Sequence, residues 1–127
     1  MKRETVHTKN APAAIGPYSQ GIKAGGFVYV SGQIPLAPDT QEMVTGDIKA
    51  QAEQVMDNVG AILEASGSSF DQVVKTTIFL TDMGNFAAVN EVYGKYFKEN
   101  PPARATIAVA QLPRSAAVEI EAVALCD

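Results

Sequence analysis

The last third of the chain places charged side chains inside segments that otherwise resemble apolar strands. Arg104 precedes "ATIAVA", and Glu119 and Glu121 lie within "VEIEAVAL". Charged groups are rarely buried unless they are paired or belong to a site. A guanidinium matches a carboxylate through two parallel hydrogen bonds, and a desolvated carboxyl can act as a general acid or base near neutral pH. The pattern is therefore compatible with a carboxylate clamp beside a proton-carrying acid.

Each of these side chains also has a simpler interpretation. Arg104 could form a surface ion pair at a strand end. Glu119 and Glu121 are two residues apart and share one face of a strand, which could simply face solvent. Strand parity does not decide which glutamate approaches Arg104, because the register and any bulge are unknown. Arg114, in the turn "LPRSA", is interpreted as a solvated loop residue.

Two stretches nearer the N-terminus add uncharged candidates. Tyr18 follows a Gly-Pro corner. It is either a core residue whose hydroxyl reaches solvent or a hydroxyl donor to a ligand. Ser31 and Gly32 end a strand, where glycine permits close approach to the backbone. The alternative for "SGQ" is a strand end that runs into the loop "IPLAP".

The composition argues against several other kinds of site. His7 is the only histidine and Cys126 the only cysteine, so neither a metal centre nor a Ser-His-Asp triad is predicted. The net charge of −4 disfavours a nucleic-acid binder. A single cysteine and the lack of a signal-like or membrane-spanning apolar run predict a reducing, cytoplasmic location without membrane association.

The hydrophobic periodicity predicts alternating strands and helices. Residues 18–33 resemble a hairpin turning at Gly25-Gly26, which would pair Ala24 with Phe27 and Ile22 with Tyr29. The further elements predicted are a possible strand near 5–7, a helix over 47–66, a strand over 73–80, a helix over 85–99, and strands over 103–110 and 117–125.

This order, ββαβαββ, indicates one α+β domain over residues 1–127. Two helices can cover one face of the sheet, and no element remains for the other face. Because "FVYV" and "TTIFL" offer apolar side chains to both faces, we predict a homo-oligomer whose sheets pack together.

The motifs "GPYSQGI", "VYVSGQIP", "VVKTTIFLTDMGNFAAVNEVYGKYF", "PPARATIAVAQLP" and "VEIEAVAL" resemble the RidA/YjgF family, also called the L-PSP translation inhibitor family, over essentially the whole chain. The resemblance implies a two-layer, chorismate-mutase-like protomer with a mixed sheet, assembled as a homotrimer with a central barrel. It also implies a deaminase that hydrolyses reactive 2-imino acids and enamines, such as 2-iminobutanoate and 2-iminopropanoate, to 2-oxo acids and ammonia. No cofactor or metal is implied, and pyridoxal-phosphate-dependent dehydratases would supply the substrate.

The resemblance also assigns roles to individual residues in a cleft between subunits. It implies that Arg104 binds the substrate carboxylate, that Glu119 handles water and protons, and that Tyr18 assists. The substrate-binding positions implied are Ser31, Gly32, Asn90 and Thr106, where Thr106 replaces a cysteine found in some members. Alternative functions are an endoribonuclease or translation inhibitor, and a non-enzymatic trimer that binds 2-oxo acids.

Overall fold

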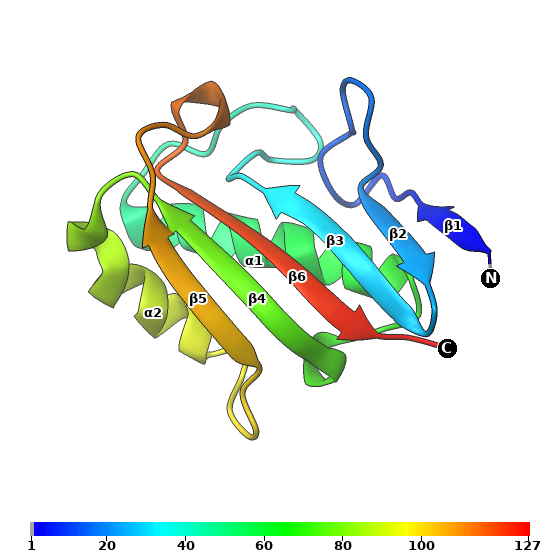
Figure 1. The fold of residues 1–127 in the computed structure, drawn as a ribbon. Coiled ribbons are helices and arrows are strands. Elements are labelled where there is room, and N and C mark those ends of the chain that lie inside the picture. The colour runs from blue at the N-terminus through cyan, green and yellow to red at the C-terminus, as the bar shows by residue number, and fades with distance from the viewer. Residues whose placement is uncertain (1) are drawn as a thin grey trace.

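The computed structural model describes residues 2–127, which form one mixed sheet and two α-helices (Figure 1). The strand order is β1-β2-β3-β6-β4-β5; β4 and β5 are parallel, and the other neighbours are antiparallel. The α+β prediction is confirmed. The strands are β1 (Arg3–Val6), β2 (Gly21–Ala24), β3 (Phe27–Gln33), β4 (Val73–Leu80), β5 (Ala103–Ala108) and β6 (Val118–Leu125), and the α-helices are α1 (Ile48–Ala65) and α2 (Phe86–Gly94).

The predicted hairpin is confirmed in its register. Ile22 pairs with Tyr29 and Ala24 with Phe27. Gly25 and Gly26 have φ values of 60° and 84°, the left-handed conformations that a two-residue primed turn requires. The register shifts between Val30 and Gln33, where β3 leaves its regular pairing with β6.

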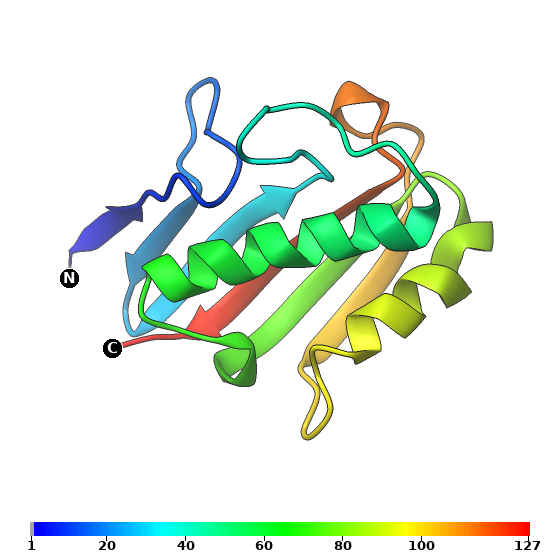
Figure 2. The ribbon, with the colours of Figure 1, turned by 180° about the vertical axis from the view of Figure 1, so that it is seen from behind.

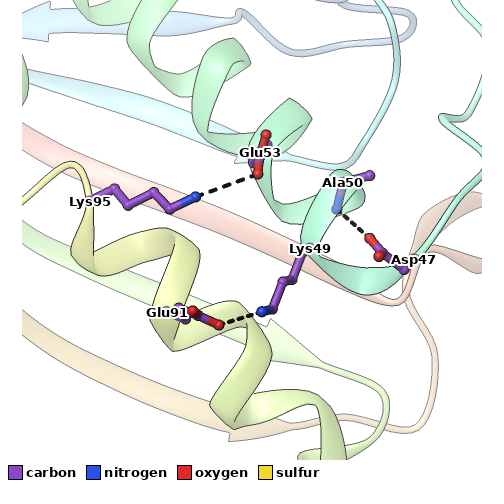
Figure 3. Close-up of polar contacts among 6 residues, drawn as sticks. All are labelled: Asp47, Lys49, Ala50, Glu53, Glu91 and Lys95. Atoms are coloured by element: carbon purple, nitrogen blue, oxygen red, sulfur yellow. Dashed lines mark hydrogen bonds and ion pairs between the residues drawn. The ribbon is translucent and has the colours of Figure 1, made fainter.

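Helix α1 begins and ends where its sequence predicts. Asp47 is the N-cap, and its carboxylate accepts a hydrogen bond from the Ala50 backbone N–H at 2.9 Å (Figure 3). At the other end Ser66 is the C-cap, and Gly67 follows with a φ of 82°. The apolar stripe of the helix packs on the sheet through Val55, Val59 and Ile62, among others.

Helix α2 is shorter than the predicted span of 85–99. Asp82 caps a preceding 3₁₀ turn, Met83–Asn85, and Asn85 makes no side-chain cap bond. The helix ends at Gly94, a residue that disfavours helix continuation. The chain then turns so that the Phe97 ring lies 4.6 Å from Tyr93, which gives the apolar residues after Gly94 a packed position without a helix.

Both helices cover the same face of the sheet, and the opposite face is open (Figures 1 and 2). Two surface ion pairs, Lys49–Glu91 and Lys95–Glu53, join α1 to α2 on their outer side (Figure 3). The open face carries Tyr29, Ile107 and Leu125, which are 43–49% exposed. No helix in residues 2–127 is long and apolar enough to span a membrane.

Candidate active site

Arg104 lies at the edge of the sheet, on the face that the helices cover. Its position on β5 pairs with Thr76 of β4. The guanidinium Nη1 donates a hydrogen bond to Asn90 Oδ1 of α2 at 2.7 Å, and the guanidinium carbon lies 5.5 Å and 5.0 Å from the ring centres of Phe86 and Tyr93. These aromatic and amide contacts hold the guanidinium in one orientation, although the side chain is exposed.

A buried pair of hydroxyl groups, from Tyr93 and Thr76, holds the Tyr93 ring that contacts Arg104. The Tyr93 hydroxyl and Thr76 Oγ1 lie 2.7 Å apart. Burial raises the pKa of Tyr93 above its ordinary value of 10.0, so the ring beneath Arg104 stays neutral. Thr106, two positions along β5, places Oγ1 in a buried position where it has no hydrogen-bond partner within residues 2–127.

Asn90, a predicted substrate-binding residue, contacts Arg104. Its amide oxygen accepts a hydrogen bond from the guanidinium. A guanidinium has five N–H donors, so the bond to Asn90 leaves donors for a carboxylate. Asn90 can therefore act on a ligand through Arg104.

Glu119 lies on the other face of the sheet, where the open face meets the loops after β3 and before β6. Its neighbours Val118 and Ile120 point into the core under the helices, so the strand alternation turns Glu119 away from them. The carboxylate lies against Gly32: a β-carbon built at Gly32 would collide with Glu119 Oε2. The glycine of "SGQ" therefore provides the space that the acid occupies.

The surroundings of Glu119 favour its protonated form. Burial raises the pKa of the Glu119 carboxyl above its ordinary value of 4.5, and the charge of Glu121 raises it further. Glu121, in contrast, is exposed. Among residues 2–127, neither carboxylate forms an ion pair. A carboxyl with a raised pKa can exchange protons at neutral pH more readily than an ordinary glutamate.

Glu119 lines a cavity of about 510 Å³ together with three of the other predicted site residues, Tyr18, Ser31 and Gly32. Ser31 Oγ donates to the Ser19 carbonyl at 2.5 Å, which ties the end of β3 to the segment that carries Tyr18. Tyr18 is 53% exposed. Tyr18 lines the cavity, so its hydroxyl is a candidate hydrogen-bonding group for a ligand there.

The predicted residues therefore form two groups. The Arg104 group includes Asn90 and Thr106, and the Glu119 group includes Tyr18, Ser31 and Gly32. Within one chain the two groups lie on opposite faces of the sheet: Arg104 contacts α2, whereas Glu119 faces away from the helices. A single chain does not bring the clamp and the acid to one ligand.

The sequence interpretation missed the residues that shape the cavity walls. The buried amide of Gln20 donates to the carbonyls of Thr8 and Pro12 at 3.0 and 2.8 Å, which holds one wall. The buried amide of Asn58 donates to the Leu36 carbonyl at 2.9 Å, which holds the other. A polar residue within an apolar stripe was the available signal for Asn58.

Arg114 is an exposed loop residue, as its sequence predicts, and it also lines the cavity that contains Glu119. Its Nη1 donates to the Gln41 carbonyl at 3.2 Å across the rim. No sequence motif distinguished it, because the chain folds the loops around residues 41 and 114 together from distant positions.

Among residues 2–127, no three histidine, cysteine, aspartate or glutamate side chains gather in a way that could hold a metal ion. Cys126 is a free thiol of intermediate burial, and it lies outside both groups of predicted site residues.

Comparison with known proteins shows which proteins this chain resembles. A model of the family described as Endoribonuclease L-PSP matches residues 8–126. Protein DfrA of Myxococcus xanthus is 58% identical over 98% of this chain and 97% of its own length. The mouse 2-iminobutanoate/2-iminopropanoate deaminase is 48% identical, over 97% of this chain and 91% of its own. A crystal structure from Thermotoga maritima, 52% identical, superposes with a TM-score of 0.96 over 100% of this chain and 99% of that one.

The match spans almost the whole chain, includes every site residue discussed above, and is accompanied by full-length relatives and a shared fold. This chain therefore belongs to the L-PSP family, the family that the sequence motifs identify as RidA/YjgF.

Proposed function

We propose that this protein hydrolyses small 2-imino acids, such as 2-iminobutanoate and 2-iminopropanoate, to 2-oxo acids and ammonia. The observation that carries the proposal is a pair of half-sites, one with the guanidinium of Arg104 held by Asn90 and Tyr93, the other with the partly buried carboxyl of Glu119. The name of the mouse relative supports the choice of reaction. Pyridoxal-phosphate-dependent dehydratases are the enzymes expected to release such substrates.

The two half-sites form one active site when copies of the chain associate, with Arg104 from one copy and Glu119 from a neighbour. The open sheet face, with exposed Tyr29, Ile107 and Leu125, is the surface available for this contact. A closed ring of three copies, as expected from the family, would use the same contact three times and give three equivalent sites.

In the reaction, Arg104 binds the substrate carboxylate through the donors that Asn90 leaves free. Glu119 accepts a proton from water as the water oxygen bonds to the protonated imine carbon. The resulting carbinolamine receives that proton on nitrogen, its C–N bond breaks, and the hydroxyl loses a proton to leave a 2-oxo acid and ammonium. A positioned acid-base group contributes roughly 10²- to 10⁴-fold to such a step.

Tyr18 and the backbone around Gly32 complete the Glu119 half-site. Tyr18 lines the cavity beside the carboxylate and can orient the water. Gly32 brings its main chain close to Glu119 because it has no side chain. Ser31 fixes this segment through its bond to the Ser19 carbonyl.

The direct test is ammonia release from 2-iminobutanoate generated in situ, with and without the protein. Arg104→Ala and Glu119→Ala are each expected to lose at least about 10²-fold in kcat/KM. Arg104→Lys should also fail, because an ammonium lacks the planar fork. Arg3→Ala, which removes an exposed arginine from β1, is the matched control and should keep its activity.

The shared site has its own test. Arg104→Ala and Glu119→Ala chains, each inactive, are mixed under conditions that exchange subunits. A site needs the intact arginine of one chain and the intact acid of the other, so random mixing should restore about one quarter of the wild-type activity. Mixed oligomers that remain inactive would show that the two residues do not act across an interface.

Endoribonuclease activity is the competing function, because the family description carries that word. Glu119 is the acid that RNA cleavage by general acid-base catalysis would be expected to use, since His7 is the only histidine of the chain and lines neither half-site. RNA cleavage that survives in Glu119→Ala would therefore come from elsewhere. Cleavage that disappears in this variant, without any effect on imine hydrolysis, would favour the nuclease.

A further inference from the structure

The cavity beside Glu119 extends well beyond the reacting groups of a small imino acid. Its volume is about 510 Å³, and most of its wall is apolar, formed by residues such as Pro12, Ile15, Ile34 and Leu36. Ile15 is 78% exposed and borders the opening. Substrate side chains longer than an ethyl group therefore have space and apolar contacts in this cavity.

Among the cavity-lining residues in the described part of the chain, Glu119 and Arg114 are the charged ones. The two charges do not pair, because no arginine nitrogen lies within 4.0 Å of a carboxylate oxygen in residues 2–127. Burial and the charge of Glu121 raise the pKa of the Glu119 carboxyl, whereas a cation beside it would lower this pKa. The Arg114 guanidinium is thus an uncompensated positive charge at a second position of the same cavity.

Arg114 is held at the rim by contacts between loops. Its Nη1 donates to the Gln41 carbonyl, and the Gln41 side-chain oxygen accepts from the Ala13 backbone N–H at 3.2 Å. Both Arg114 and Gln41 have left-handed backbones, with φ values of 56° and 61°. Non-glycine residues adopt this conformation at a cost and often do so where a site requires it. Three loops therefore meet to place one cation.

We infer that Arg114 determines specificity by binding a negatively charged group at the end of the substrate side chain. This inference rests on the proposed function, because it takes the orientation of the substrate from Arg104 and Glu119. With the C1 carboxylate on Arg104 and C2 beside Glu119, the side chain lies along the apolar wall. A second carboxylate can then reach Arg114, so the favoured substrates are dicarboxylic 2-imino acids.

The test compares two stable 2-oxo acids of equal chain length, 2-oxoglutarate and 2-oxopentanoate, which differ in a terminal carboxylate against a methyl group. Each is measured as a competitive inhibitor of 2-iminobutanoate hydrolysis. An exposed charge pair corresponds to about 3- to 5-fold in affinity, so wild type should bind 2-oxoglutarate about 3- to 5-fold more tightly. Arg114→Gln should reduce this ratio to about one, and Arg3→Gln, the control for net charge, should keep it.

Wild-type protein that hydrolyses 2-iminobutanoate but prefers 2-oxopentanoate would overturn the inference and leave the proposed function intact. Wild-type protein that fails to hydrolyse 2-iminobutanoate would overturn the proposed function. Calorimetric binding of the two 2-oxo acids would then measure the same ratio, and a ratio of about one would overturn the inference as well. If Arg114→Gln does not fold, the wild-type ratio is measured against salt, and a ratio that does not fall between 0.05 and about 0.5 M salt excludes a charge effect.

Discussion

Gly32→Ala tests whether the position of the Glu119 carboxylate controls catalysis. The added methyl group would lie 2.9 Å from Glu119 Cδ and 3.2 Å from Cγ, and it would collide with Oε2. The φ of Gly32 is outside the left-handed range, so alanine can adopt the same backbone. The carboxylate, which ends a flexible side chain, is the group that must move.

The expected loss follows from this displacement. Ordinary contact begins near 3.4 Å, so Cδ must retreat by about half an ångström and Oε2 by at least about 1 Å. A misplacement of 1 Å in a reacting group can cost about 10²-fold in rate. Stability should change by less than about 1 kcal/mol, because replacement of glycine by alanine also restricts the unfolded chain.

The assay is kcat/KM for 2-iminobutanoate, with thermal unfolding measured on the same samples. Gly94→Ala is the control, since a β-carbon there meets nothing within 4 Å. A double variant with Glu119→Ala separates the causes: if Gly32→Ala acts through the carboxylate, it should cost nothing further in that background. Wild-type kcat/KM in Gly32→Ala would refute the argument that this glycine places the acid.

Three further predictions concern stability. The pKa of Glu119 is raised in the folded state, so the ionised carboxylate destabilises the fold at neutral pH. Glu119→Gln should therefore raise Tm at neutral pH. This gain in Tm should disappear as the pH falls through the raised pKa toward the ordinary value of 4.5. Gln20→Ala leaves the buried carbonyl groups of Ala11 and Pro12 without a donor, so the free energy of unfolding in urea should fall by about 2–4 kcal/mol. Gln72→Ala, at an exposed position, is the control and should leave this free energy unchanged. Thr106→Val removes an unpartnered buried hydroxyl, so the free energy of unfolding should rise by up to about 1 kcal/mol. If the free energy of unfolding instead falls by more than about 1 kcal/mol, Oγ1 has a hydrogen-bond partner in the assembled protein.

Local signals were sufficient to predict most of the fold. The Gly25-Gly26 turn fixed the hairpin register, and Asp47 and Gly67 marked the ends of α1. The end of α2 was predicted too late, because the aromatic residues after Gly94 continue a helical apolar pattern. In the structure Phe97 follows a turn after Gly94, and its ring packs on Phe70 and Tyr93 without a helix.

The candidate site was harder to predict because it depends on contacts between distant segments. The residue types of Arg104 and Glu119 suggested their chemistry, but their position on opposite faces follows from the register of β4 with β5 and β6. Gln20 and Asn58 resemble ordinary polar residues until the fold buries them. Arg114 belongs to the cavity only because its loop meets the loop around Gln41.

The contact between Gly32 and Glu119 also links two positions in evolution, although they lie 87 positions apart along the chain (119 minus 32). Any side chain at position 32 competes with the acid for one volume, so the two positions should vary together among homologous sequences. A homologue that gains a side chain at the first position has little reason to keep glutamate at the second. Such a pair of exchanges would mark lineages in which this half of the pocket has taken up different chemistry.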